Sequence, residues 1–403
     1  MNLRDNAVTI ARRALQAVPD SLLSRVLPGR LAWDNEAMQV AHAPDARVRL
    51  LVAPMNSAGQ GYRWARAAEQ NLIDVGAVSM MLTNPARDRY SFPVDVSVPE
   101  SGFVFASRWQ RRQRQVIIDD FSHVLLESGQ YPFGSLPGRT PLQAVDELTR
   151  EGKSVALLWH GSDIRVPSLH VEEEPDSPFG QRGGYPQAST AVLETNARAR
   201  LRMVTETDLP VFVSTPGLLN VPRARWLPVV VDIERWGSDA APLQQQVPTV
   251  AYVPSNSPMK GDPSIDVQLA GLESEGLIRY RRLENIPSRD MPKIYRSADI
   301  VLDQFRLGDY GVAACEALAA GRVVIGHVNE RNRARVKETT GLELPIVEAR
   351  FSDVAATVRR VVEDREAFAE HAAKGTSFAR AVHSGAASAA ALAEFLGTEV
   401  RER

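Results

Sequence analysis

The sequence predicts an α/β protein built from two domains in tandem, each with a parallel sheet covered by helices. The chain has 403 residues, of which 44% are hydrophobic, enough to fill more than one core. From residue 47 onward, short apolar runs alternate with polar helical stretches, which is the pattern of strands buried on both faces. A polar, Gln-rich stretch at 232–248 divides this series and has the composition of a linker.

The order of the apolar runs sets the expected domains. We place the boundary near residue 240, with a first domain over 1–240 and a second over 241–374, and we expect the linker to act as a hinge. The predicted strands of the first domain are 48–54, 77–82, 116–119, 124–127, 154–159, 211–214 and 227–231. Those of the second domain are 249–253, 277–283, 299–303, 322–326 and 344–347.

Composition limits the class of partner. A net charge of −2 provides no global field to attract nucleic acid or anionic lipid. The single cysteine, Cys315, excludes an internal disulfide and leaves no second thiol for a thiolate metal site. We find neither a signal-peptide pattern nor a run of about 18 apolar residues, so we expect a cytoplasmic protein.

The N-terminal segment is expected to be an amphipathic helix. Apolar residues recur at helical spacing over 3–18, and Pro19 ends the pattern. Because four of these residues are alanines, docking onto its own domain is favoured, and peripheral contact with the inner face of the membrane is the alternative. The long loop at 171–186, rich in acids, proline and glycine, is expected to be a solvated excursion.

Two loops that follow predicted strands could hold phosphate. The turn at 53–61 leaves the first strand and opens a helix, so it presents free N–H groups and the positive end of a helix dipole. It lacks the glycine patterns of dinucleotide sites and P-loops, so an empty tight turn is as plausible. The loop at 253–261 carries Lys260 before Gly261, a point charge suited to a diphosphate, with a solvated lysine as the alternative.

His160 follows a predicted strand directly, in the motif WHGSDIR at 159–165. The carboxyl ends of parallel strands form the edge where open sheets bind ligands, and Gly161 would let a substrate approach the backbone. Asp163 and Arg165 could orient this turn. A hydrogen-bonded loop histidine is the alternative, and His123 is a weaker candidate of the same kind.

The most specific stretch is 299–321, DIVLDQFRLGDYGVAACEALAAG. A strand ends at Asp303, a glycine-containing loop follows, and a helix begins near Val312. A ligand could lie against this helix N-terminus, while the two carboxylate oxygens of Glu316 suit a vicinal diol such as ribose. A buried capping carboxylate is the alternative for Glu316.

These motifs, in this order, resemble the retaining GT-B glycosyltransferases of family 4, whose two Rossmann-like domains face each other across a cleft that holds a nucleotide-sugar. The likeness covers about 47–395. Its strongest piece is GDYGVAACEALAAG, which is similar to the family signature E-G-F-G-x-x-x-x-E-A-M-A-x-G. Supporting pieces are HGSDIR, the Lys-Gly at 260 and 261, WLPVVVD before the linker and MPKIYRSADIVL before the signature.

The resemblance implies a role for each matched residue. Glu316 would bind the ribose hydroxyls, Lys260 the diphosphate, and His160 the transferred sugar near its anomeric centre, while Gly59 would close the first loop over the phosphates. The other donor-binding candidates are Gln60, Gly261, Gly308, Tyr310, Gly311 and Val312. The helix at 375–403 would cross back to the first domain and dock through an apolar stripe.

Two departures from the family stand out. Gly308 occupies the position of a glutamate that binds sugar hydroxyls in the family, and Asp309 beside it is the available substitute. Asp309 and His160 are therefore the candidate catalytic residues. The family's arginine before the lysine is also missing, because 254–257 contains no cation.

The implied reaction is transfer of a hexosyl group from a UDP- or GDP-sugar with retention, without metal or another cofactor, the leaving diphosphate being stabilised by Lys260 and helix N-termini. An inverting transferase with His160 as base, a nucleotide-sugar epimerase and a non-catalytic sugar-binding relative are the alternatives. The acceptor, whether glycan, lipid-linked or small molecule, is open. Four aromatic residues could stack on its rings or belong to the core: Trp64, Trp109, Tyr131 and Phe133.

Overall fold

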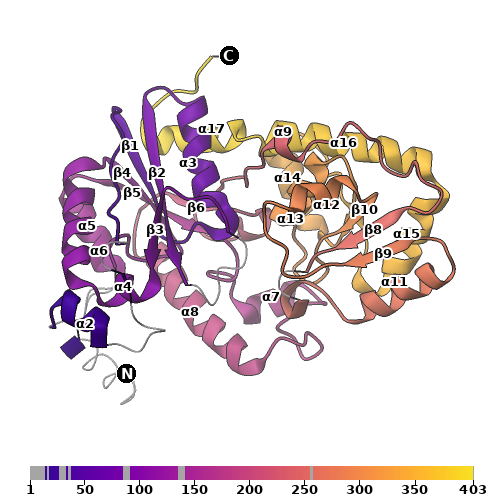
Figure 1. Cartoon of the computed structure of the whole chain (residues 1–403), viewed down its shortest axis with the longest axis horizontal. Coiled ribbons are helices and arrows are strands. Elements are labelled where there is room, and N and C mark those ends of the chain that lie inside the picture. Colours follow the sequence, from indigo (N-terminus) through magenta and orange to yellow (C-terminus); the bar gives the residue numbers. More distant parts are fainter. Residues whose placement is uncertain are drawn as a thin grey trace.

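The computed structural model describes residues 14–15, 18–26, 33–34, 38–84, 91–134, 141–254 and 257–402. It contains two parallel sheets that lie beside each other along the length of the molecule (Figure 1). Most of the helix expected over 3–18 lies outside the described residues, and α2 (Asp20–Val26) follows it. In the described ranges, no helix combines the length and the apolar character needed to cross a bilayer.

The first sheet has seven strands in the order β3-β2-β1-β4-β5-β6-β7, and all pairs are parallel. Its strands are β1 (Val48–Ala53), β2 (Val75–Thr83), β3 (Val96–Pro99), β4 (His123–Glu127), β5 (Ser154–Trp159), β6 (Val211–Val213) and β7 (Ala224–Trp226). Its helices are α3 (Gln60–Asn71), α4 (Glu100–Phe105), α5 (Ser107–Asp120), α6 (Pro141–Arg150), α7 (Pro167–Glu173) and α8 (Gln187–Thr205), with 3-10 turns η2 (Ser57–Gly59) and η3 (Pro216–Leu218).

The second sheet has five parallel strands in the order β12-β11-β10-β8-β9. Its strands are β8 (Thr249–Tyr252), β9 (Arg279–Arg282), β10 (Ile300–Leu302), β11 (Val323–Gly326) and β12 (Val347–Glu348). The helices that follow β7 are α9 (Ile233–Trp236), α10 (Ser257–Lys260), α11 (Ser264–Ser274), α12 (Met291–Arg296), α13 (Val312–Ala319), α14 (Glu330–Thr340), α15 (Val354–Glu363), α16 (Arg365–His383) and α17 (Ala386–Leu396), with the 3-10 turn η4 (Phe351–Asp353).

Each sheet has one place where the strand order reverses direction. In the first sheet it lies between β1 and β4, and in the second between β8 and β10. At such a switch point the loops at the carboxyl ends of the two strands diverge and leave a crevice, which is where open α/β sheets bind ligands. The strand order therefore selects the loops after β1, β4, β8 and β10 as the walls of a site.

The last two helices join the domains. Helix α16 packs on α13 and β11 of the second domain, and α17 packs on α3 and β5 of the first (Figure 1). Leu392 and Leu396 of α17 are buried in a hydrophobic cluster that includes Trp64 of α3 and Ala314 of α13. This shared core stabilises the two sheets as one body.

The connection at 232–248 is held against the second domain. The N–H of Leu243 donates to Asp299 Oδ1 (2.6 Å), and Arg365 donates to the carbonyls of Gln245 (2.6 Å) and Gln246 (2.8 Å). The hinge expected near 240 therefore lies in a segment that is hydrogen-bonded to its neighbour, although its composition is that of a linker.

Three strand predictions were wrong in whole or in part. Residues 116–119 belong to helix α5, because Trp109, Gln113 and Ile117 are all buried, a four-residue spacing that fits one helix face. Residues 227–231 are buried but form no strand, and β12 takes only the end of 344–347.

Candidate functional site

Loops at the carboxyl ends of strands from both sheets surround one cavity of about 280 Å³, and these include the switch-point loops after β1, β8 and β10 but not the described part of the loop after β4. The first domain contributes the turns after β1, β5 and β6, and the second contributes Met259 of α10 and the loop after β10. The lining residues are Ser57, Ala58, Gln60, His160, Gly161, Ser162, Arg165, Ser214, Thr215, Val229, Met259, Gln304, Leu307, Asp309, Tyr310, Gly311 and Val312. We call this space the interdomain cavity.

His160 enters the interdomain cavity from the end of β5. Its backbone N–H donates to Asp163 (3.0 Å), and its ring Nε2 lies 3.1 Å from Glu127 Oε1. Burial lowers the pKa of His160, but the hydrogen bond and charge of Glu127 and the charge of Asp163 outweigh that effect and raise the pKa overall. The imidazole is thus disposed to carry a positive charge at the cavity wall.

Glu127 is a site residue that the sequence analysis missed. It is the last residue of β4 and is fully buried. Its Oε1 faces His160, while its Oε2 accepts hydrogen bonds from the N–H groups of Met55 (2.8 Å) and Asn56 (2.9 Å). One carboxylate therefore ties the first loop to the histidine. The available signal was a charged residue closing an otherwise apolar strand at the sheet edge.

Trp64 of α3 stacks on the His160 ring, with centroids 5.7 Å apart and planes 18° from parallel. Its indole N–H donates to the carbonyl of Pro228 (2.8 Å), so the ring is locked in place. Trp109, Tyr131 and Phe133 are buried in the core of the first domain. None of these four aromatic residues lines the interdomain cavity, so for them the core interpretation holds.

Gly59 and Gln60 shape the first loop. Gly59 adopts φ +73° where α3 begins, a conformation that glycine takes without strain. The Gln60 amide forms two hydrogen bonds with the backbone of Val230, accepting from its N–H (2.7 Å) and donating to its carbonyl (3.2 Å). Gln60 thus lines the cavity and also joins α3 to the segment that leads out of the first domain.

Asp309 lies in the cavity wall but is held by the first domain. Its Oδ2 accepts hydrogen bonds from Arg165 Nη2 (3.3 Å) and from the N–H of Gly217 (3.1 Å). Burial raises the pKa of Asp309, opposed mainly by the charge of Arg165. In this arrangement the carboxylate forms a buried ion pair between the domains.

The N-terminus of α13 opens onto the cavity. Gly311 is its N-cap and provides no capping side chain, and Gly311 and Val312 both line the cavity. Tyr310 is buried, its hydroxyl lies 3.3 Å from His383 Nε2, and burial raises the pKa of Tyr310 well above its usual value. The N–H of Gly311 donates to Oδ2 of the buried Asp303 (3.4 Å), so the N–H groups of the first helical turn after it are the ones left for an anionic ligand.

The other expected donor residues are distributed around this helix. Glu316 is one turn after Val312 on α13 and is not among the cavity-lining residues. The carbonyl of Gly261 accepts from Arg306 Nε (2.7 Å), and that of Gly308 accepts from Asn332 Nδ2 (2.7 Å). Lys260 ends α10, and its side chain lies outside the described part of the chain.

The expectation of a solvated excursion at 171–186 was wrong. Glu174 is 2% exposed and lies against the second domain, where its Oε2 is 3.1 Å from His327 Nε2 and its Oε1 is 3.5 Å from Arg350. Asp176 pairs with Arg350 as well. Three acidic residues of this segment, Glu173, Glu174 and Asp176, have histidine or arginine partners on the other domain, so the segment forms part of the interdomain contact.

His123, the weaker histidine candidate, lies away from the cavity. Its ring contacts Phe395 of α17 edge to face, with centroids 5.3 Å apart. Among the residues that the structure describes, no three His, Cys, Asp or Glu side chains gather as metal ligands would.

No family model and no curated protein matches this chain. Solved structures do resemble it. Sucrose-phosphate synthase from Thermosynechococcus elongatus shares 12% identity at a TM-score of 0.52, over 86% of this chain and 97% of that one. Anabaena HepE, in complex with UDP-glucose, shares 13% identity at a TM-score of 0.54, over 86% of this chain and 98% of that one. An alpha-glucosyltransferase, in complex with UDP-glucose and DNA containing an abasic site, shares 9% identity at a TM-score of 0.51, over 86% of this chain and 98% of that one. Likeness at these identities establishes architecture: the chain has the GT-B fold, two Rossmann-like domains that face each other across a cleft.

Proposed function

We propose that this protein transfers a hexosyl group from a UDP- or GDP-sugar to an acceptor, with retention of configuration and without a metal ion. The observation that carries the proposal is the interdomain cavity itself. There His160, from the carboxyl edge of one sheet, and the N-terminus of α13, from the carboxyl edge of the other, line the same space. An imidazole whose pKa is raised and the N–H groups of a helix N-terminus around one space suit a sugar diphosphate.

The structural likeness supports the same donor class. HepE and the alpha-glucosyltransferase were both solved with UDP-glucose. Since their fold is shared over 86% of this chain, we infer that a nucleotide-sugar is the donor here. Glu316 would then bind the ribose hydroxyls and Lys260 the diphosphate, as the sequence resemblance implies.

The chemistry follows from the groups around the cavity. The bond between the anomeric carbon and the phosphate oxygen breaks, and a bond to the acceptor oxygen forms on the same face of the sugar. The acceptor proton passes to the departing phosphate, so no carboxylate base is required. The described buried carboxylates nearby include Glu127, Asp303 and Asp309, and each already accepts at least one hydrogen bond. The charge of His160 and the helix N-termini would stabilise the departing diphosphate.

A binding experiment tests the donor site. Thermal shift with UDP and with GDP is measured on the native protein, Glu316→Ala and Lys260→Ala. We expect one nucleotide to raise the melting temperature of the native protein and both variants to lose most of that rise, because the ligand stabilises only the folded form that binds it. The exposed pair Lys337 and Glu343 provides matched controls, Lys337→Ala and Glu343→Ala, which should behave as the native protein. No stabilisation by either nucleotide would contradict the proposal.

Turnover separates the alternatives. The protein is incubated with a panel of UDP- and GDP-sugars, with and without candidate acceptors. Nucleotide release that depends on acceptor supports transfer, conversion of the donor alone supports an epimerase, and binding without turnover supports a sugar-binding relative. The anomeric coupling constant of the product, measured by NMR, tests retention. Full activity after treatment with EDTA would support independence from metal.

A further inference from the structure

Helices α3 and α13 face each other across the cleft. Gln60 at the start of α3 and Val312 at the start of α13 both line the interdomain cavity. Arg63 lies three residues after Gln60, and Glu316 lies four after Val312. Because residues three or four apart share a helix face, Arg63 and Glu316 continue the two walls beyond the cavity. Consistent with this, Glu316 is the charged residue that acts most strongly on the Arg63 guanidinium.

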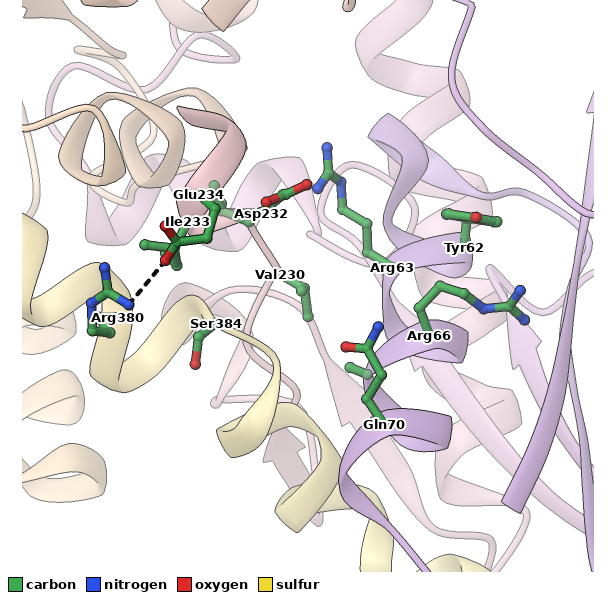
Figure 2. Close-up of a pocket in the computed structure, with 12 residues that line it drawn as sticks. Tyr62, Arg63, Arg66, Gln70, Val230, Asp232, Ile233, Glu234, Arg380 and Ser384 are labelled. Atoms are coloured by element: carbon green, nitrogen blue, oxygen red, sulfur yellow. Dashed lines mark hydrogen bonds and ion pairs between the residues drawn. The ribbon is translucent and has the colours of Figure 1, made fainter. Parts of the chain in front are cut away.

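Arg63 also borders a second cavity of about 500 Å³, which we call the α3 cavity (Figure 2). It is lined by α3, by residues 230–234 and by the end of α16, and its lining residues are Tyr62, Arg63, Arg66, Ala67, Gln70, Val230, Val231, Asp232, Ile233, Glu234, Arg380 and Ser384. Figure 2 shows the Arg63 side chain directed toward Asp232, while Arg380 pairs with Glu234 at 3.2 Å.

The hydrogen-bonding capacity of Arg63 is unused in the described part of the chain. Arg66, one turn along the same helix, is bonded to Asp95, Glu69 and the carbonyl of Ala77. No described carboxylate or carbonyl accepts a hydrogen bond from Arg63, although burial lowers its pKa and the charges of Glu316 and Asp232 oppose that shift. Because no Arg63 nitrogen is among the described buried side-chain atoms that lack a partner, the guanidinium reaches solvent at the cavity, where its five donors are available to a ligand.

The charges around Arg63 narrow the class of ligand. An anion would be repelled by Glu316 and Asp232, and a cation would be repelled by Arg63. A hydroxyl group suits both sides, because its proton donates to a carboxylate while its oxygen accepts from a guanidinium. A vicinal diol offers two such groups.

We propose that Arg63 and Glu316 form a diol site across the cleft and bind the ribose of the donor nucleotide from opposite domains. This proposal rests on the proposed function, which assigns the ribose to Glu316, and adds a second partner from the first domain. It also supplies a cation at the donor site of a chain that lacks the family's arginine before Lys260. Because the two side chains belong to different domains, a ribose bound between them would hold the cleft closed.

The test compares two ligands on matched variants. Affinity is measured by calorimetry for the nucleoside diphosphate that stabilises the native protein, UDP or GDP, and for its 2′,3′-dideoxy analogue. We expect Arg63→Gln to weaken binding of the normal nucleotide about tenfold or more, because a hydrogen bond to a charged group is lost. Binding of the dideoxy analogue should change little, since it has no hydroxyls to lose. Glu316→Gln should show the same pattern.

Arg380→Gln is the matched control. It removes a positive charge from the α3 cavity, but Arg380 is exposed and pairs with Glu234. This variant should bind both ligands as the native protein does. If it weakens binding as much as Arg63→Gln, general electrostatics explain the effect and the diol site is wrong.

The outcomes separate this proposal from the proposed function. If the native protein binds neither UDP nor GDP, the proposed function fails and the diol site fails with it. If the native protein binds the normal and dideoxy nucleotides equally well, or if Arg63→Gln weakens both equally, the diol site is overturned while donor binding stands. The double variant should be no weaker than the weaker single variant if both side chains act on the same diol.

Discussion

The carboxylate of Glu174 fills the space that a side chain at Gly308 would need. A Cβ built on Gly308 would overlap Glu174 Oε2 and would lie 2.6 Å from Asn329 Nδ2, and the Gly308 backbone has φ +59°. The family that this sequence resembles has a glutamate at this position. Here a glutamate from the first domain reaches the same backbone and bonds to His327 of the second. The departure from the signature thus accompanies a contact between the domains.

We predict that Gly308→Ala lowers the free energy of unfolding by about 2–4 kcal/mol. About 1 kcal/mol comes from the left-handed backbone, and the rest from displacing Glu174 out of its buried ion pair. Gly341→Ala is the matched control, because Gly341 has φ +73° and open space around its Cβ position. This substitution should therefore lower the free energy of unfolding only by the contribution of the left-handed backbone, about 1 kcal/mol. Guanidinium denaturation measures the free energy of unfolding of both variants. Equal losses of stability in Gly308→Ala and Gly341→Ala would contradict the role of Glu174.

His327 should make stability depend on pH. Burial lowers its pKa, but hydrogen bonds to Glu174 (3.1 Å) and Glu348 (2.6 Å) and the charges of both raise it to about 9. Since this folded value exceeds the ordinary 6.5, the stabilisation is complete below about pH 6.5 and is lost as pH rises toward 9. We expect the free energy of unfolding to fall by up to about 3 kcal/mol across that window.

The matching variant is His327→Gln, in which that fall should be absent. Denaturation at pH 6, 7.5 and 9 compares it with the native protein and with His42→Gln at an exposed position. His42→Gln shows the effect of losing an exposed histidine, so any further difference in His327→Gln reports the pairing of His327 with Glu174 and Glu348. The same pH slope in the native protein and His327→Gln would refute the assignment.

Asp309→Ala should destabilise the protein by about 3 kcal/mol, because it leaves the buried Arg165 guanidinium and the Gly217 N–H without their acceptor. A further Arg165→Leu change should cost much less in the Asp309→Ala background than in the native one, since the uncompensated charge is then removed. Denaturation of the native protein, the two single variants and the double variant gives the coupling free energy between Asp309 and Arg165. Additive losses would show that the two residues do not act as a pair.

Glu127 should set the ionisation of His160 and through it the pH dependence of donor binding. The pKa of His160 is raised overall despite burial, so nucleotide affinity should fall as pH rises through a value above 6.5. In Glu127→Gln the charge that favours the imidazolium is gone, and the fall should move to lower pH. In His160→Gln it should disappear. Calorimetry with UDP or GDP from pH 5.5 to 9 measures the three profiles, and coincident profiles would exclude His160 as the titrating group.

The sequence by itself determined the strands and the loops that follow them. Buried runs such as 154–159 and 299–303 are encoded by neighbouring residues, and a parallel sheet brings their carboxyl ends to one edge. Within each sheet this brings the loops after the strands to one edge, so His160 lies at the edge of the first sheet and Gly311 and Val312 at the edge of the second, while the packing of the two domains makes them line one cavity. Local pattern failed where spacing was ambiguous, as at 116–119, where four residues are too few to distinguish a strand from one turn of a buried helix.

Only the tertiary structure decided which polar groups meet. Glu127 bonds to His160 across 33 positions of chain, and Glu174 bonds to His327 across 153. No periodicity records such pairs, because the partner of a buried carboxylate depends on which loops converge at the sheet edges and on how the two domains pack. The same is true of Arg63 and Glu316: the sequence singles out Glu316 but gives no reason to connect it with Arg63, and only the placement of α3 and α13 around the interdomain cavity brings the two charges into each other's field.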